Sequence, residues 1–263
     1  MNILENIMVH KRKEVAIRRT LTSEKELLNY PYSQSEIPSF TASILNPERS
    51  GIIAEYKRES PSKGTINQSS SLVEVIPAYD EAGASAISVL TDSRFFGGNI
   101  YDLVRARKLT NIPLLRKDFV FDEYQILEAR CSGASAILLI AAVLSKEEIN
   151  RLAAFARSLD LEVLCEVHSE EELEKVSDHV NAVGVNNRDL KTFNVSFERS
   201  LELAELIPDR FVKVSESGIN DPKAIETLRK AGFRGFLIGE YFMKGDNPGQ
   251  RCRDFISKLS KNR

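Results

Sequence analysis

The chain has 263 residues, a length that suits one large α/β barrel or two ordinary domains. Its net charge of −2 argues against a protein that works on nucleic acid or on an anionic membrane. Three cysteines without a CxxC pair argue against a disulfide framework and a structural zinc site. The first residues lack the apolar core of a secretory signal, and no apolar run approaches the ~20 residues of a membrane helix. We therefore expect a cytoplasmic protein.

Residues 1–47 precede the strand pattern and indicate one or two helices and a linker, which Pro31 and Pro38 interrupt. The segment contains a cluster of basic residues: Lys11, Arg12, Lys13, Arg18 and Arg19. One interpretation is a solvated helix face. The other is a segment that caps one mouth of the following fold and contacts its substrate.

From Ser50 onward, short β-branched runs alternate with amphipathic stretches. The predicted strands are Ile52–Tyr56, Ala86–Leu90, Pro113–Arg116, Ala136–Ile140, Glu162–Val167, Ala182–Val185, Phe211–Val214 and Gly235–Ile238. The clearest predicted helices are Ser71–Ala82, Ser145–Leu159 with a capping box from Ser145 to Glu148, and Asp221–Ala231 with Asp–Pro at its start and Gly232 after it.

Eight strand–helix units predict parallel strands with helices outside them, and their number favours a closed barrel over an open doubly wound sheet. The strands are short and largely apolar, as expected where both faces are covered. The predicted fold is an α/β fold, a (β/α)8 TIM barrel over residues 48–263, with an N-terminal helical extension over residues 1–47.

Charged residues occur where several of these strands end, and a barrel gathers its catalytic groups there. Strand alternation places Glu55, Lys57, Lys117 and Glu166 on the inward face near the mouth. An inward carboxylate has a raised pKa unless a cation lies near it, and the two lysines could supply that cation. Such a cluster is a candidate for general acid–base catalysis, although each residue alone is equally explained by an ion pair or a solvated strand end.

Polar and glycine residues follow the last three strands. Asn186 and Arg188 could orient a polar substrate, with an ordinary turn as the alternative. Ser217–Gly218 and Gly239 would let backbone N–H groups approach an anion, with a helix start adding a favourable dipole. We therefore expect the phosphate site of the barrel there, although Glu240 would repel a phosphate unless its side chain points away.

The sequence shows no pattern typical of a metal or nucleotide site. His10, His168 and His179 form no close ligand pair, and Cys165 and His168 should face opposite sides of a strand. There is no GxGxxG and no Walker motif. We expect neither a metal nor another cofactor.

Given these residues, the chain resembles the indole-3-glycerol phosphate synthases from about Ile3 to the last helix. The resemblance rests on six segments that occur in family order at strand ends: IIAEYKRESPSKG (Ile52–Gly64), LLRKDF (Leu114–Phe119), CEVH (Cys165–His168), NNRDL (Asn186–Leu190), SESGI (Ser215–Ile219) and LIGE (Leu237–Glu240). Together they are highly specific, although none is alone. Residues 1–47 are similar to the family's extra helical segment on the substrate side.

The resemblance implies a cofactor-free carboxy-lyase of tryptophan biosynthesis. It converts 1-(2-carboxyphenylamino)-1-deoxyribulose 5-phosphate into indole-3-glycerol phosphate, CO2 and water. Lys117 is implied as the acid at the ketone, Glu166 as the carboxylate that moves protons while the hydroxyl leaves, and Lys57, together with Arg188, as the cation at the aryl carboxylate. The other implied catalytic residues are Glu55, Asn186 and Glu216. The other implied substrate-binding residues are Ser60, Phe119, Ser217, Gly218, Leu237, Gly239 and Glu240. We expect a monomer that takes this small phosphorylated substrate and binds neither nucleic acid nor membrane.

Two other functions stay open. Phosphoribosylanthranilate isomerase is a barrel enzyme with a similar ligand, but it needs a Cys/Asp pair for which Cys165 is poorly placed. A non-catalytic barrel that binds a phosphorylated metabolite would not need Lys57, Lys117 and Glu166 together. Phe95–Phe96, after the second strand, fits the family loosely: an aromatic ring there would pack on the substrate's ring, or both residues belong to the core.

Overall fold

The computed structural model describes residues 3–189 and 194–260. Its parallel strands close into a barrel in the order β1-β10-β9-β8-β7-β6-β5-β4, and β4 pairs again with β1. The barrel strands are β1 (Ile52–Tyr56), β4 (Ala86–Leu90), β5 (Leu114–Lys117), β6 (Ala136–Ile140), β7 (Glu162–Val167), β8 (Ala182–Asn186), β9 (Val212–Glu216) and β10 (Gly235–Ile238). A small hairpin, β2 (Glu59–Ser60) and β3 (Gly64–Thr65), follows β1. The predicted (β/α)8 barrel is confirmed.

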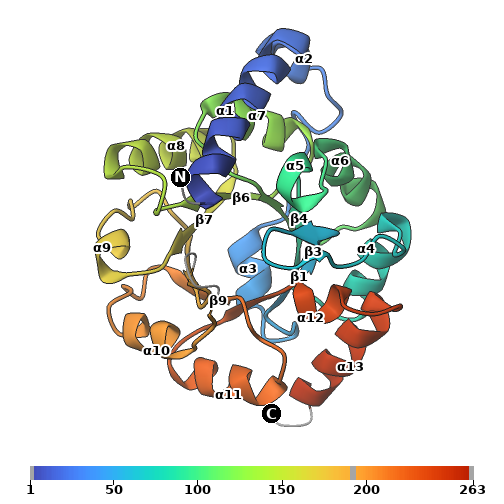
Figure 1. Ribbon diagram of the computed structural model, residues 1–263, viewed down its shortest axis with the longest axis vertical. Coiled ribbons are helices and arrows are strands. Elements are labelled where there is room, and N and C mark those ends of the chain that lie inside the picture. The colour runs from blue at the N-terminus through green and yellow to red at the C-terminus, as the bar shows by residue number, and fades with distance from the viewer. Residues whose placement is uncertain (1–2, 190–193, 261–263) are drawn as a thin grey trace.

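Helices surround the strands on all sides (Figure 1). Those that follow β1 in the chain are α4 (Leu72–Glu81), α5 (Ser93–Phe96), α6 (Ile100–Leu109), α7 (Glu123–Cys131), α8 (Lys146–Ser158), α9 (Glu170–Leu173), α10 (Glu198–Ala204), α11 (Pro222–Lys230), α12 (Glu240–Met243) and α13 (Pro248–Ser260). The predicted capping box at Ser145 starts α8, and Asp221 caps α11 ahead of its first proline. None of the helices in the described part of the chain is long and apolar enough to cross a membrane.

Strand alternation divides the core into two layers. Inward residues such as Ile53, Leu115 and Leu164 fill the barrel, whereas the outward residues pack beneath the helices. The floor of the barrel comes from the N-terminal extension, because Phe40 and Ile44 of α3 (Phe40–Leu45) join the inner layer. The barrel is therefore closed at the N-terminal ends of its strands and open only at the other end.

The extension contains three helices, α1 (Ile3–Leu21), α2 (Glu24–Leu27) and α3, one more than the sequence predicts. The N-terminal end of α1 lies at the edge of the barrel, near β6 and β7 in the view of Figure 1, and its C-terminal half lies beside α7. There Val15 and Leu27 pack against Tyr124 and Leu127. The extension thus contributes to both ends of the barrel, because α1 lines part of the open mouth and α3 closes the floor.

Candidate active site

The open end of the barrel holds a cavity of about 730 Å³, a size typical of small-molecule sites. Every site residue expected from the sequence lines it: Glu55, Lys57, Ser60, Lys117, Phe119, Glu166, Asn186, Arg188, Glu216, Ser217, Gly218, Leu237, Gly239 and Glu240. They come from β1, β5, β7, β8, β9 and β10 and from the segments that follow them. The structure brings all fourteen together, and their roles stay predictions. The last residue of the NNRDL segment, Leu190, lies outside the described residues.

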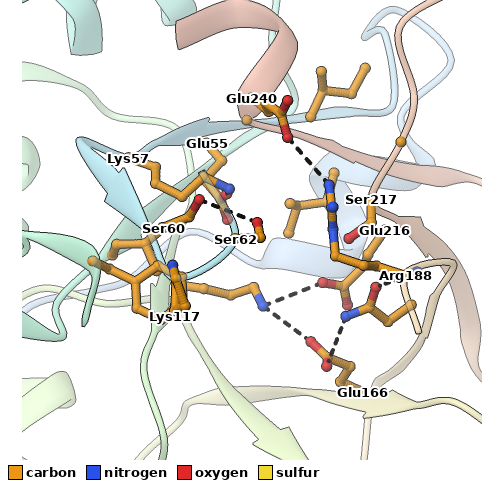
Figure 2. A pocket seen from close by; sticks show the side chains of 18 of the residues that line it. Glu55, Lys57, Ser60, Ser62, Lys117, Glu166, Arg188, Glu216, Ser217 and Glu240 are labelled. Atoms are coloured by element: carbon orange, nitrogen blue, oxygen red, sulfur yellow. Dashed lines mark hydrogen bonds and ion pairs between the residues drawn. The ribbon is translucent and has the colours of Figure 1, made fainter. Parts of the chain in front are cut away.

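Lys117 lies between two carboxylates, as Figure 2 shows. Its Nζ is 3.1 Å from Oε2 of Glu166 and 3.5 Å from Oε2 of Glu216. Asn186 donates from Nδ2 to the other oxygen of Glu166, at 3.1 Å. These four side chains project from β5, β7, β8 and β9, and both carboxylates are almost fully buried. The predicted inward alternation of Lys117 and Glu166 is confirmed.

Lys57 pairs with Glu55 rather than with Glu166. Its Nζ is 2.7 Å from Oε1 of Glu55, and Ser88 donates to the second oxygen of Glu55 at 3.2 Å. This pair lines the same cavity as Lys117. The site therefore offers two ammonium groups that are held by different carboxylates.

Two glycines make room for these carboxylates. A Cβ atom on Gly184 of β8 would lie 2.1 Å from Oε1 of Glu216, and one on Gly239 would lie 2.4 Å from Oε1 of Glu55. Real Cβ atoms do not approach so closely, so either carboxylate would have to move. Gly239, which the sequence associates with phosphate, thus also has a steric role beside Glu55.

The two carboxylates at Lys117 have pKa values shifted in opposite directions. Burial raises the pKa of Glu166, but Lys117, His168 and the hydrogen bond from Asn186 outweigh it, and the net shift is downward. Burial also raises the pKa of Glu216, Glu166 and Glu55 add repulsion, and the result is about 7 despite Lys117. The pKa of Lys117 is well above its ordinary range because the carboxylates outweigh its burial. The surroundings thus separate the pKa values of the two carboxyl groups: Glu166 is suited to act as a base and Glu216 as an acid. Acid–base catalysis needs such a pair.

The far side of the cavity is built from backbone. Ser217 and Gly218 have φ values of 69° and 78°, a conformation that is uncommon for serine. Helix α12 begins directly after Gly239, and no side chain caps its first turn. By contrast, Asp221 already accepts a hydrogen bond from a first-turn N–H of α11. The uncapped start of α12 and the left-handed backbone of the turn after β9 are therefore suited to an anion.

The Glu240 carboxylate is paired with a cation, because its Oε2 lies 3.2 Å from Nη2 of Arg188 (Figure 2). The pair links the segment after β8 to the start of α12. The sequence predicts that Glu240 repels a phosphate unless its side chain points away. The side chain lines the cavity, but its contact with Arg188 offsets its charge.

Apolar side chains form much of the remaining wall, and most were not expected from the sequence. The polar residues that also line it are Ser62, Lys63, Asp118, Asn220 and Lys244. Ile3, Leu4 and Ile7 of α1 line the cavity. Phe96 lines it too, with its ring 6.0 Å from that of Phe119. Neither Phe95 nor Phe96 is fully buried, so the interpretation of both as core residues is wrong. Leu138 and Ile140 of β6 also face the cavity, a position that strand alternation alone could have predicted.

The interpretation of the basic residues of α1 as a solvated helix face is wrong for two of them, Lys11 and Arg18. Lys11 is 1% exposed, and its Nζ lies 2.7 Å from Asp92 and 2.9 Å from Asp118. Arg18 contacts Glu128 at 3.0 Å. The other three basic residues named above are exposed: Arg12, Lys13 and Arg19. Because α1 also lines the cavity, the interpretation of this segment as a cap on the mouth is confirmed.

Cys165 packs in the outer layer of the core, while His168 reaches Glu166 on the inner side, as predicted. Burial raises the pKa of the Cys165 thiol far above its ordinary value, which makes it unsuited to acid–base chemistry. Among residues 3–189 and 194–260, no group of three or more His, Cys, Asp or Glu side chains could hold a metal ion.

A closed (β/α)8 barrel with a buried Lys/Glu cluster at its mouth defines a small-molecule enzyme of the TIM-barrel class. A family model described as "Indole-3-glycerol phosphate synthase" matches residues 4–255. The chain belongs to the indole-3-glycerol phosphate synthase family.

Relatives of that name agree with the family model. One from Bacteroides thetaiotaomicron is 46% identical over 260 residues, covering 98% of this chain and 99% of its own. One from Prochlorococcus marinus is 44% identical, covering 92% of this chain and 85% of its own. Among solved structures, a tryptophan synthase complex from Pyrococcus furiosus matches with a TM-score of 0.60 at 14% identity, over 81% of this chain and 99% of that one. At that identity, the likeness shows the fold alone.

Proposed function

We propose that the chain closes the indole ring of tryptophan. It converts 1-(2-carboxyphenylamino)-1-deoxyribulose 5-phosphate into indole-3-glycerol phosphate, CO2 and water, without a cofactor. The observation that carries the proposal is the position of Lys117 between Glu166 and Glu216 at the mouth of a barrel of this family. The reaction needs an acid, a base, a carboxylate-binding cation and a phosphate site, and the residues of the cavity suit each of these.

Ring closure begins when an aryl carbon, the one that bears the carboxylate, attacks the ketone of the sugar chain. The ketone oxygen gains an electron pair, and the Lys117 ammonium donates a proton to it. The surrounding carboxylates keep this ammonium protonated, since its pKa is raised well above the ordinary value. The developing alkoxide is a strong base, so it can take the proton from such an ammonium.

The attack leaves the aryl ring in an iminium-like state, and decarboxylation of this ring is the next step. The electron pair of the bond to CO2 returns to the ring and restores its aromaticity, so no cofactor has to accept electrons. Lys57, together with Arg188, binds the carboxylate and fixes which ring carbon faces the ketone. The pairing of Lys57 with Glu55 at 2.7 Å supports this role, because it holds the ammonium at the cavity wall.

Loss of water completes the indole. The hydroxyl leaves as water after gaining one proton, the neighbouring carbon loses one proton, and a double bond forms between the two carbons. Glu166 suits these transfers because it lies 3.1 Å from Lys117 and stays ionised in spite of its burial. Because Glu166 is ionised, it takes the proton from the carbon and gives that proton to the departing hydroxyl, and Lys117 regains from solvent the proton that it donated in ring closure.

The phosphate is anchored at Ser60, Ser217, Gly218 and Gly239. The start of α12, which no side chain of the described residues caps, and the left-handed backbone at Ser217 support this placement. Ser217→Gly removes the hydroxyl and suits the φ of 69° better than serine does. We expect KM to rise about 5-fold, near 1 kcal/mol of lost binding, with kcat little changed and the fold at least as stable. Steady-state kinetics, with inorganic phosphate as a competitive inhibitor, measure both effects, and an unchanged KM and inhibition constant would remove Ser217 from the phosphate site.

The proposal extends to the state of the protein. Residues 1–47 form an extension of the barrel of residues 48–263. The packing of α3 at the barrel floor supports an extension of the barrel rather than a separate domain. The enzyme acts in the cytoplasm as a monomer, without a nucleic-acid or membrane partner, which its net charge of −2 supports. Light scattering on the purified protein tests the monomer directly.

The deciding experiment mixes the purified protein with the carboxyphenylamino-deoxyribulose phosphate in a buffer that contains a metal chelator. Indole absorbance and fluorescence report the product. Rapid indole formation supports the reaction and its independence of divalent metal together. Substrate binding without product would favour a barrel that only binds its ligand, and no binding would contradict the proposal.

A further inference from the structure

His168 lies at the end of β7 and is absent from the roles assigned so far. Its side chain is 9% exposed, and its Nδ1 lies 3.1 Å from Oε2 of Glu172 on α9. The same oxygen accepts a hydrogen bond of 2.7 Å from the backbone N–H of His168. Glu172 therefore holds both the ring and the backbone of His168, and this contact favours the proton on Nδ1.

The other ring nitrogen faces the proposed catalytic carboxylate. Nε2 of His168 lies 3.5 Å from Oε1 of Glu166 and has no hydrogen bond within the described parts of the chain. That Oε1 accepts from Asn186 at 3.1 Å, while Lys117 contacts the opposite oxygen, Oε2, at 3.1 Å. Glu166 thus contacts Lys117 and Asn186, which line the cavity, and also approaches the His168 ring.

His168 is not a wall of the cavity, since neither it nor Glu172 is among the residues that line it. It lies behind Glu166, so any effect on the reaction must pass through that carboxylate. A buried ring nitrogen without a partner is costly unless it has a function, and a small movement of Glu166 would complete the hydrogen bond.

The charges around His168 favour its cationic form. Three carboxylates act on it, Glu172 from α9, Glu166 from β7 and Glu216 from β9, and together they outweigh burial and raise its pKa. Two cations lie on the neighbouring elements. Lys117 of β5 is engaged by Glu166 and Glu216, and Lys175, after α9, donates to the carbonyl of Ala141 at 2.9 Å.

We propose that Glu172 and His168 form a positioning pair for Glu166. Glu172 fixes the orientation of the imidazole, and the N–H at Nε2 orients the Glu166 carboxylate and keeps a positive charge beside it. Both residues act through Glu166 and do not touch the substrate themselves. The buried carboxylate of a hydrolase triad likewise acts indirectly, by orienting the histidine next to it. This inference rests on the proposed function of Glu166.

A purely structural role would be to attach α9 to the end of β7. The variant Glu172→Gln separates the two roles, because a glutamine oxygen can still accept the backbone hydrogen bond while the charge is lost. The variant His168→Gln removes the imidazole and its charge. His179→Gln is the matched control, since His179 lies near the opposite end of the strands, just ahead of β8, and does not line the cavity.

The pH dependence of kcat/KM is the first measurement. If His168 lowers the pKa of Glu166, its removal raises that pKa, and the acidic limb of the profile moves to higher pH by about half to one unit. We expect kcat to fall about 10-fold in His168→Gln and less in Glu172→Gln, with KM changed less than about 3-fold. His179→Gln should match the wild type. Profiles of both variants that superimpose on the wild type would overturn the inference.

An NMR titration gives a readout that is independent of turnover. The chain has three histidines, so single His→Gln variants assign all the imidazole signals. We expect the pKa of His168 to lie above the ordinary value and to fall in both Glu172→Gln and Glu166→Gln. A His168 signal that ignores Glu166→Gln would also overturn the inference. If the wild type binds substrate without forming indole, the proposed function fails, whereas normal wild-type turnover with unshifted variants defeats only the positioning pair.

Discussion

The cluster of lysines and glutamates in the cavity contains more carboxylates than ammonium groups. Lys57 and Lys117 face Glu55, Glu166 and Glu216, so two positive charges meet three negative ones. The excess negative charge separates the pKa values of Glu166 and Glu216, and it keeps Lys117 protonated. Glu166 and Glu216 both contact Lys117, so a pH profile of the enzyme will report values that belong to these three groups together.

Replacement of Lys117 tests the proposed acid. We expect Lys117→Ala to lower kcat at least about 100-fold, because the alkoxide would form without a proton donor, while the substrate still binds through its phosphate and carboxylate. Stopped-flow binding and steady-state turnover on the same preparation separate the two effects. Lys223→Ala, an exposed lysine on α11, is the control for the loss of a positive charge. Turnover near that of the wild type would remove Lys117 from the mechanism.

Alternation along each strand made several of the residues proposed as catalytic predictable one by one. Once a strand is placed, Glu55 and Lys117 must face the interior, because residues two apart share a face. The contacts between strands were not predictable in the same way. The position of Lys117 of β5 between Glu166 of β7 and Glu216 of β9 depends on how the strands are arranged around the barrel, which no local pattern contains.

At the scale of elements, α1 is joined to the barrel by buried charges. Lys11 contacts Asp92, which precedes α5, and Asp118, which directly follows Lys117. Burial raises the pKa of Asp118, but Lys11 and Arg116 outweigh it and hold that pKa far below its usual range. The helix that supplies the apolar wall of the cavity is thus attached one residue from the proposed acid.

Lys11→Met should loosen this attachment. It leaves Asp92 and Asp118 buried without their shared cation, and we expect the fold to lose about 3–5 kcal/mol of stability. Deuterium uptake in residues 3–21 should rise, and KM should increase about 10-fold as the wall formed by α1 becomes mobile. Hydrogen-exchange mass spectrometry and substrate titration measure these effects.

Lys13→Met provides the matched control, because Lys13 is exposed on the same helix. It removes the same charge without disturbing a buried pair, so its stability should change by less than about 0.5 kcal/mol. Equal exchange in the two variants would contradict the attachment of α1 through Lys11.

The bounds of most elements follow from local patterns, and the exceptions have physical causes. Strand β9 extends through Ser215 and Glu216, two polar residues that end the apolar run in the sequence. They remain in the strand because Asn186 of β8 and Phe236 of β10 pair with them. Helix α3 was missed because its six residues stand in the barrel floor, where packing rather than periodicity decides the structure.

For the whole molecule, the number of strand–helix units predicts the barrel, but its closure depends on one non-local contact. The pairing of β1 with β10 joins segments nearly two hundred residues apart in sequence, through Ile53 and Leu237. No local signal specifies that register, although Gly51 contributes to it: a Cβ there would lie 2.5 Å from the carbonyl oxygen of Arg234. The same closure brings Glu55 of β1 and Glu216 of β9, which have β10 between them, to one cavity.

Glu216 connects the stability of the whole fold to its activity. Its pKa is about 7 in the folded protein, raised by burial and by Glu166 and Glu55, against about 4.3 in an unfolded chain. Between these pH values the folded state holds a proton that the unfolded state lacks, so stability falls as pH rises through this window. Above pH 7 the fold contains a buried ionised carboxylate, which costs on the order of 1–3 kcal/mol.

Glu216→Gln removes that cost, because the amide is similar in shape and stays neutral. At pH 8 the variant should therefore be more stable than the wild type, with a melting temperature several degrees higher, at about 2–4 °C per kcal/mol for a chain of this size. At pH 5 the two proteins should melt nearly together, since the wild-type carboxyl is itself neutral there. Turnover should fall at the same time, as expected where an active-site charge is kept at the expense of stability. Calorimetry at both pH values measures the difference, with Glu123→Gln on the surface as the control; a melting temperature at pH 8 no higher than that of the wild type would mean that the carboxylates and lysines of the cavity compensate the buried charge fully.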